Sequence, residues 1–347
     1  MLHRSSLRIS ASRLQPAFDL LRDAVFRGEL PVGLLAVATG RETLRCEAYG
    51  QQVPIGTDGI FWIASITKPI VATAIMQMVE RGRLILEDAV VRYIPEFGAN
   101  GKEGVTVWHL LTHTSGMADD YWNDPGVEPS ARADLEGALG THLRFPPGTQ
   151  FEYCNVSYRV LGEILRRTSG RDYWEYLREE VLYPAGMDDT DFQPEPSKRS
   201  RLLPVHDFPW ARGGMEAFMS LAMPSGGLFS TAADLVAFGQ AFLNSGVGRR
   251  GRLLSAAAMR VMTSVHTEGI PRHDNGAVEH WGLGWEKATP REGRLVTTHG
   301  FGHGGMSGAY LWIEPDSDLV IVFLTNRVGL DGRVRKGIVN AVMAALE

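Results

Sequence analysis

The chain has few cysteines and lysines and no long uninterrupted apolar run. Only two of its 347 residues are cysteines, Cys46 and Cys154, too few for a disulfide framework, so we expect reduced thiols. No run approaches the length that a bilayer-spanning helix needs, and residues 1–15 lack the apolar core of a signal peptide. These absences predict a cytoplasmic protein without membrane association.

A strong excess of charge of one sign is also absent. The net charge of −5 and the isoelectric point near 6.1 give no reason to expect nucleic acid or an anionic membrane as partner. Hydrophobic residues at 44 % and charged residues at 22 % are typical of a globular protein with a substantial core. The length allows one large domain or two of ordinary size, and the sequence makes no prediction about oligomeric state.

Lysine is scarce, and one of the five lysines lies in the only Ser-x-x-Lys of the chain, Ser65-Ile66-Thr67-Lys68. An apolar stretch leads into Ser65, and an amphipathic helix pattern follows from Thr67 to Arg81. The spacing puts the hydroxyl and the ammonium on one helix face and leaves the Ser65 N–H among the unpaired amides of the helix start. This suits a serine nucleophile with an amine as proton acceptor. The alternative is that the same residues form the capped start of a surface helix.

Strand patterns occur near both ends of the chain, and helix patterns fill the middle. The predicted extended segments are 33–38, 44–49, 60–63, 295–298, 308–313 and 319–324. The predicted helices are 13–27, 67–81, 106–116, 157–170, one from Asp172 that Pro184 stops, one capped by Thr231, and 334–346.

This order predicts an α+β fold in which both ends of the chain share one antiparallel sheet, flanked by the N- and C-terminal helices. Residues 1–84 and 274–347 are expected to form the sheet domain, and residues 85–273 an all-helical domain.

Two further segments carry candidate side chains. Tyr153 and Asn155 lie two residues apart, so both face one cleft if the chain is extended there. Tyr153 is a candidate proton relay to Ser65, with Lys68 favouring its phenolate, and Asn155 can orient the Lys68 ammonium and bind a substrate carbonyl or amide. By itself, a tyrosine before a helix is more often a packing residue.

A glycine-rich segment, His303-Gly304-Gly305-Met306, lies between predicted strands. Its glycines let the backbone approach a ligand closely, and the Met306 N–H is a candidate oxyanion donor beside that of Ser65. A hairpin with an exposed histidine is the alternative interpretation of this segment alone.

Together the three motifs resemble, in order and spacing, the signatures of serine hydrolases of the class C β-lactamase and penicillin-binding-protein type. Four flanking segments are similar too, and the resemblance spans about residues 14–347. These flanking segments are 110–117, 147–149, 224–228 and 310–326.

The resemblance implies a β-lactamase/transpeptidase-like fold with the active site in a cleft between the sheet and the helical domain. It implies an acyl-enzyme on Ser65, proton transfer by Lys68 and Tyr153, assistance from Asn155, and an oxyanion hole made by the amides of Ser65 and Met306. The substrate is then a small-molecule ester or amide, and neither a metal nor an organic cofactor is required.

One departure bears on the substrate. β-Lactamases and D-alanyl-D-alanine peptidases typically have Lys-Thr-Gly as the third motif, and here His303 and Gly304 replace the lysine and the threonine. A mostly neutral imidazole attracts a substrate carboxylate less than an ammonium does. The pattern therefore looks closest to the family VIII carboxylesterases, which act on short-chain esters. A β-lactamase, a D-amino-acid amidase or peptidase, and a non-catalytic penicillin-recognising protein are the alternatives.

Other interpretations are weaker. His109 and His113 have the i, i+4 spacing of zinc ligands, but the glutamate of H-E-x-x-H is missing, so we expect them to brace the adjoining turn. No serine has the G-x-S-x-G context of an α/β-hydrolase. Cys154 is expected to be a small buried filler. Trp281, Trp285 and Trp312 are expected to be core or cleft-wall aromatics, with Trp285 a candidate for lining the acyl pocket.

Overall fold

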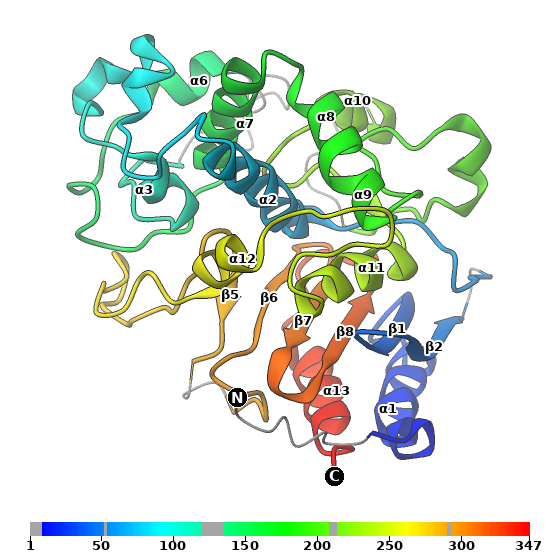
Figure 1. Cartoon of the computed structure of the whole chain (residues 1–347). Helices are drawn as coiled ribbons and strands as arrows, with labels where there is room; N and C mark the ends of the chain where they lie inside the picture. Colours follow the sequence, from blue (N-terminus) through cyan, green and yellow to red (C-terminus); the bar gives the residue numbers. More distant parts are fainter. Residues whose placement is uncertain (1–8, 52–53, 120–134, 208–213, 290–292) are drawn as a thin grey trace.

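The structure, a computed structural model, describes residues 9–51, 54–119, 135–207, 214–289 and 293–347. Six strands form one antiparallel sheet in the order β2-β1-β8-β7-β6-β5 (Figure 1). Their bounds are Val32–Thr39 (β1), Thr43–Gly50 (β2), Glu286–Lys287 (β5), Phe301–Gly304 (β6), Tyr310–Glu314 (β7) and Leu319–Leu324 (β8). Because β1 pairs with β8, with Ala36 opposite Val322, the two ends of the chain share this sheet as predicted.

The sheet is covered on both faces, which explains the unbroken apolar run of β8. Residues 320, 322 and 324 belong to one hydrophobic core and residues 319, 321 and 323 to another. A strand that is half exposed would alternate apolar and polar residues, whereas a strand buried on both faces reads as a continuous apolar run. The Leu-Val-Ile-Val-Phe-Leu sequence of β8 therefore requires helices on both sides.

Two terminal helices cover one face and a third helix covers the other. Helices α1 (Gln15–Phe26) and α13 (Arg333–Met343) pack together on one face, and α11 (Ala232–Leu243) packs on β1, β7 and β8 from the opposite side (Figure 1). The α1 residues Phe18, Leu21 and Val25 recur at helical spacing and are fully buried. The expected α+β fold with flanking terminal helices is confirmed.

The remaining helices lie beyond the end of the sheet where α11 begins (Figure 1). They are α2 (Thr67–Glu80), α3 (Val107–Leu111), α6 (Leu135–Gly140), α7 (Val156–Ser169), α8 (Tyr173–Leu177), α9 (Tyr183–Ala185), α10 (Gly214–Ser220) and α12 (Ala256–Thr263). Helix α2 contacts α7, α8 and α12 and is buried over most of its length.

The helical part and the α11 face of the sheet contribute to one hydrophobic core. The domain boundaries at residues 84 and 274 stay a prediction. Among the described residues, no helix combines the length and the apolarity that a membrane crossing requires.

Three local predictions are wrong. Residues 295–298 are not a strand: the Leu295 N–H bonds to the Asn340 side chain, and the Thr297 N–H and hydroxyl bond to the Glu314 carboxylate, so side chains take the place of a strand partner. Pro184 does not stop the helix that Asp172 caps, because the chain continues through a π-helical turn at 178–182 into α9.

The third difference concerns the helix expected over 106–116. It begins after an N-cap at Thr106 but ends at Leu111, and His113 has a left-handed φ of 59° that a helix cannot accommodate. The short extended segment at 60–63 is present as β3 (Phe61–Trp62), which pairs with β4 (Phe229–Ser230) outside the main sheet.

We predict that two helix glycines respond to alanine with opposite signs. In α11, a Cβ at Gly239 would lie 2.6 Å from Val320 Cγ1 in the sheet, whereas a Cβ at Gly337 in α13 meets nothing within 4 Å. Alanine favours a helix by up to about 1 kcal/mol, but overpacking a core costs about 1–3 kcal/mol. Urea unfolding should show that Gly239→Ala destabilises the protein and that Gly337→Ala stabilises it. A stabilised Gly239→Ala variant contradicts the close contact of α11 with the sheet.

Candidate active site

Ser65 lies in a strained turn directly before α2. Its predecessor Ala64 has a left-handed φ of 46°, a conformation that costs an L-residue on the order of 1 kcal/mol and persists only where neighbours enforce it. Thr67 enforces it, because its hydroxyl donates to the Ala64 carbonyl (2.7 Å) and accepts from the Leu228 N–H (3.1 Å). Ser65 is partly exposed although residues 61–64 and 66–70 are buried.

Lys68 lies one turn further along α2, and its side chain is fully buried. Its Nζ is 3.2 Å from Ser65 Oγ and also contacts two carbonyl oxygens, Asn155 Oδ1 at 2.8 Å and the Ser225 backbone oxygen at 2.6 Å. A neutral amine has two hydrogens and one lone pair. Because the two carbonyl oxygens can only accept, they bind both N–H groups of a neutral Lys68, and the lone pair is left for the Ser65 hydroxyl.

Burial makes the neutral amine accessible near neutral pH. It lowers the pKa of Lys68 from 10.5 to about 7, against the opposing effects of Asp119 and Cys154. Loss of water disfavours the ammonium, and the two carbonyl groups replace only part of that hydration. Above this pKa the amine can take a proton from Ser65.

Tyr153 contacts the same amine through its ring. The Lys68 Nζ is 4.8 Å from the ring centroid, and the imidazole of His113 stacks on the ring with 4.4 Å between centroids. The Tyr153 hydroxyl oxygen is buried, and its hydrogen-bonding neighbour is the Ser65 hydroxyl. Burial raises the pKa of Tyr153, and the nearby Ser65 hydroxyl lowers it by less. The expectation that Lys68 favours the phenolate is therefore wrong: the phenol keeps its proton.

His303 is buried on β6, and its ring lies 6.1 Å from that of Tyr153. Its Nδ1 is 2.7 Å from the Gly304 carbonyl, so Nδ1 is the protonated nitrogen and Nε2 of the neutral ring has a free lone pair. The buried Nε2 atom has no partner among the described residues. Burial, assisted by the charge of Lys68, lowers the pKa of His303 to about 3, so this imidazole is neutral at pH 7 as the sequence suggests.

The glycines after His303 bring the backbone of the third motif against the turn that contains Ser65. A Cβ on Gly305 would lie 2.4 Å from the Ile63 carbonyl oxygen, so only glycine allows this approach. Met306 follows in a tight turn that two hydrogen bonds close, from the Gly305 N–H to the Ala309 carbonyl and from the Gly308 N–H to the Gly305 carbonyl. Gly304 differs from Gly305, because its Cβ position approaches only side chains, closest the end of Arg335 at 3.0 Å.

The other residues singled out in the sequence have packing roles. Cys154 is buried, as expected, and its N–H donates to His113 Nδ1. His109 Nδ1 accepts the Thr106 N–H at the start of α3, so this histidine braces the adjoining segment. Trp285 is a core residue between Phe238 and Phe242, whereas Trp281 borders Tyr153 and His303.

Three residues contact this group without having been assigned to it from the sequence; one of them, His113, was expected only to brace a turn. Asp119 binds Asn155, Ser225 supplies a carbonyl to Lys68, and His113 stacks on Tyr153. His113 and Ser225 lie in flanking segments that resemble the family, and Asp119 follows one of them by two residues. That proximity to the similar segments could have indicated these residues. The contact of the Ser225 backbone carbonyl could not be predicted, because every residue has such a carbonyl.

Residues 18–344 match the family described as Beta-lactamase. "Penicillin-binding protein 4" of Amycolatopsis lactamdurans is 31 % identical over 80 % of this chain and 74 % of its own length. "Esterase EstB" of Burkholderia gladioli is 28 % identical over 99 % of this chain and 98 % of its own length. The crystal structure of a penicillin-binding-protein homologue from Caulobacter crescentus has a TM-score of 0.83 at 23 % identity and covers 98 % of this chain and 99 % of that one.

The close approach of the third motif generates a prediction with an internal control. Gly305→Ala should push residues 305–306 away from Ser65, because its Cβ meets a backbone carbonyl that cannot move aside, whereas the closest neighbour of Gly304→Ala is the end of a flexible arginine. We expect the rate of Ser65 labelling by a fluorophosphonate to fall at least about tenfold in Gly305→Ala and by less than about threefold in Gly304→Ala. Equal rates in the two variants contradict a role for this contact.

Proposed function

The chain belongs to the Beta-lactamase family, and from this premise we propose that it is a carboxylesterase that cleaves neutral short-chain esters through an acyl-enzyme on Ser65. It is a hydrolase of this superfamily, whose members among its relatives include an esterase and a penicillin-binding protein. The observation that carries the proposal is the contact of the Lys68 amine with Ser65 Oγ, with both N–H groups of the neutral amine bound to carbonyl oxygens.

In the first half of the proposed reaction, Ser65 Oγ attacks the ester carbonyl carbon while its proton passes to the Lys68 lone pair. The amides of Ser65 and Met306 bind the developing oxyanion. Collapse of the tetrahedral intermediate breaks the bond to the alkoxide. The alkoxide takes a proton from the phenol of Tyr153, which recovers one from the Lys68 ammonium.

The second half repeats these steps with water as the nucleophile. Water gives a proton to the same base and attacks the acyl carbon, and Ser65 Oγ leaves with the proton that Lys68 holds. The acid is released and the amine is neutral again, so each cycle consumes one ester and one water. Asn155 keeps the amine in position throughout.

The neutral His303 supports an uncharged substrate. A pKa of about 3 leaves His303 without a positive charge for a substrate carboxylate at pH 7. Its bare Nε2 is a hydrogen-bond acceptor, which repels a carboxylate and suits a donor or an apolar group. Amide or β-lactam cleavage uses the same acyl-enzyme, and a non-catalytic binding protein would stop at acylation.

A panel of substrates tests the proposal. The wild-type protein should turn over p-nitrophenyl esters of graded acyl length, with a preference for short chains, and should hydrolyse a chromogenic cephalosporin and a D-alanine anilide at least about a hundredfold more slowly. Ser65→Ala should abolish turnover, whereas Ser220→Ala on α10, whose hydroxyl bonds within its own helix, should not. Preference for the anilide or the cephalosporin refutes the ester assignment, and a burst of one equivalent without turnover refutes the enzyme.

The pH dependence of kcat/KM should reveal the Lys68 amine. Because the reaction needs the neutral form and the pKa is about 7, activity should rise with pH and level off above about pH 8. Lys68→Met should lower kcat by at least about a hundredfold. Lys102→Met is a matched control, since Lys102 is also fully buried and donates to two backbone carbonyls, those of Leu139 and Thr141. Equal losses in both variants contradict Lys68 as the base.

A further inference from the structure

Asp119 is a buried carboxylate that binds the residue that orients Lys68. It is 6 % exposed. Its Oδ2 accepts from both the backbone N–H and the side-chain Nδ2 of Asn155, each at 3.0 Å, and its Oδ1 accepts from the Val156 N–H at 3.1 Å. All these donors lie at the start of α7.

The position explains why a carboxylate is found there. The first N–H groups of a helix lack partners within the helix, and the positive end of the helix dipole favours a negative charge. Asn155 occupies the N-cap position of α7, but its side chain makes no cap hydrogen bond. Asp119 supplies that cap from a remote loop, which leaves the Asn155 amide oxygen available to Lys68.

The same contact determines which way the Asn155 amide points. A carboxylate can only accept, so it requires the Nδ2 group of Asn155 on its side and directs Oδ1 to the opposite side, where the Lys68 Nζ lies 2.8 Å away. With the amide reversed, an N–H group would face the N–H groups of the lysine. The orientation of the Lys68 lone pair toward Ser65 therefore depends on an acceptor at residue 119.

We infer that Asp119 is a positioning residue in the proposed hydrolysis. It acts through the Asn155 amide, which keeps the lone pair of the Lys68 amine directed toward the Ser65 hydroxyl. The inference rests on the proposed function. It assigns to Asp119 no contact with the substrate, so its loss should lower kcat with little change in KM.

Asp119 also acts on Lys68 through its charge, which raises the pKa of the amine while burial lowers it. Several other titratable or aromatic groups surround Lys68, and one of them, Cys154, also contacts Asp119, with its Sγ 3.9 Å from Oδ1. These groups are Tyr153, Cys154, Tyr158, His113 and His303. Removal of the Asp119 charge should therefore move the acidic limb of the pH profile to lower pH.

The first variant is Asp119→Asn, which keeps the shape but replaces one acceptor oxygen with an NH₂ group. That group faces the donors of Asn155, and the conflict is relieved when the Asn155 amide turns over and points Nδ2 at Lys68. We expect kcat for a p-nitrophenyl ester to fall at least about tenfold, KM to change by less than about threefold, and the acidic limb to shift downward.

The second variant is the exchange Asp119→Asn with Asn155→Asp. A carboxylate at 155 accepts from the amide at 119 and from Lys68, so the acceptor beside the amine is restored. The double variant should recover at least about threefold in kcat over Asp119→Asn. Its acidic limb should lie above that of the wild type, because the negative charge now touches the amine. If Asp119 only capped α7, the acidic limb would not shift in opposite directions in the single and the double variant.

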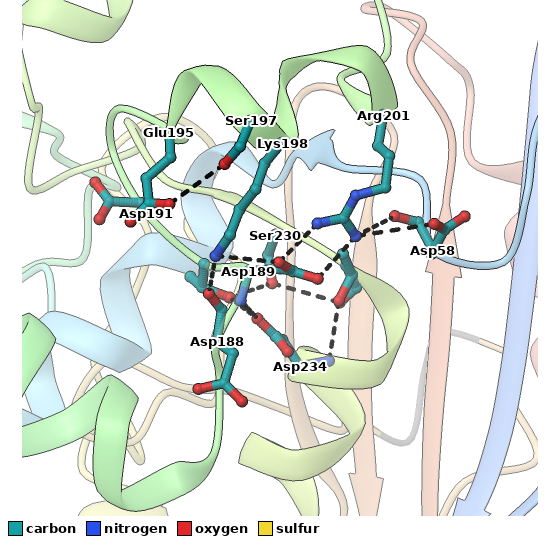
Figure 2. A network of polar contacts seen from close by, with 12 residues as sticks. Asp58, Asp188, Asp189, Asp191, Glu195, Ser197, Lys198, Arg201, Ser230 and Asp234 are labelled. Carbon is teal, nitrogen blue, oxygen red and sulfur yellow. Dashed lines mark hydrogen bonds and ion pairs between the residues drawn. The ribbon is translucent and has the colours of Figure 1, made fainter.

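Asp234 provides the matched control (Figure 2). It is 5 % exposed, lies in the first turn of α11, and its Oδ2 accepts from the Asp189 N–H at 2.8 Å and the Thr190 hydroxyl at 2.7 Å. Asp234→Asn removes a comparable buried carboxylate that is not among the influences on the pKa of Lys68. It should lower the free energy of unfolding as Asp119→Asn does, and leave kcat and the acidic limb within about twofold and 0.2 pH units of the wild type.

The outcomes separate the inference from the proposed function. Fluorophosphonate labelling of Ser65 in the wild-type protein comes first, and its absence refutes the proposed function before any variant is compared. If the wild type is labelled, wild-type kcat and an unmoved acidic limb in Asp119→Asn overturn the inference. The inference is also overturned if the acidic limb of the double variant does not lie above that of the wild type. This second test remains available if the single variant Asp119→Asn does not fold.

Discussion

Lys68 is removed from water at the start of α2, where its Nζ contacts Ser65 Oγ, Asn155 Oδ1 and the Ser225 carbonyl oxygen. These atoms come from three separate parts of the chain, so the site exists only where the start of α2, the start of α7 and the loop before β4 meet. An ammonium in such a place is poorly solvated, which makes the neutral amine accessible near pH 7. A base of ordinary lysine pKa would stay protonated and could not accept the Ser65 proton.

The same burial sets the protonation of the neighbouring groups. It raises the pKa of Tyr153 and lowers that of His303 to about 3, so both side chains are uncharged around the amine. One physical cause therefore produces a neutral base, a protonated phenol and a neutral imidazole. These are the forms that proton transfer through Lys68 and Tyr153 requires, and the neutral His303 has no charge to attract an anionic substrate.

Local periodicity predicted much of this arrangement. The i, i+3 spacing of Ser65 and Lys68 placed both groups on one helix face, and the pattern of residues 319–324 predicted the strand β8. The prediction failed where a distant partner decides the outcome. Residues 295–298 bond to side chains of Glu314 and Asn340 rather than to a strand, and the charge of Tyr153 follows from burial that spacing does not reveal.

The most direct test of this account is the titration of the Lys68 amine itself. With only five lysines in the chain, ¹³Cε-labelled lysine gives a simple NMR spectrum, and the signal absent from Lys68→Met identifies the residue. The account predicts a midpoint near pH 7 for that signal. A midpoint near the ordinary value of 10.5 would show that the buried amine stays charged and would contradict its role as the base.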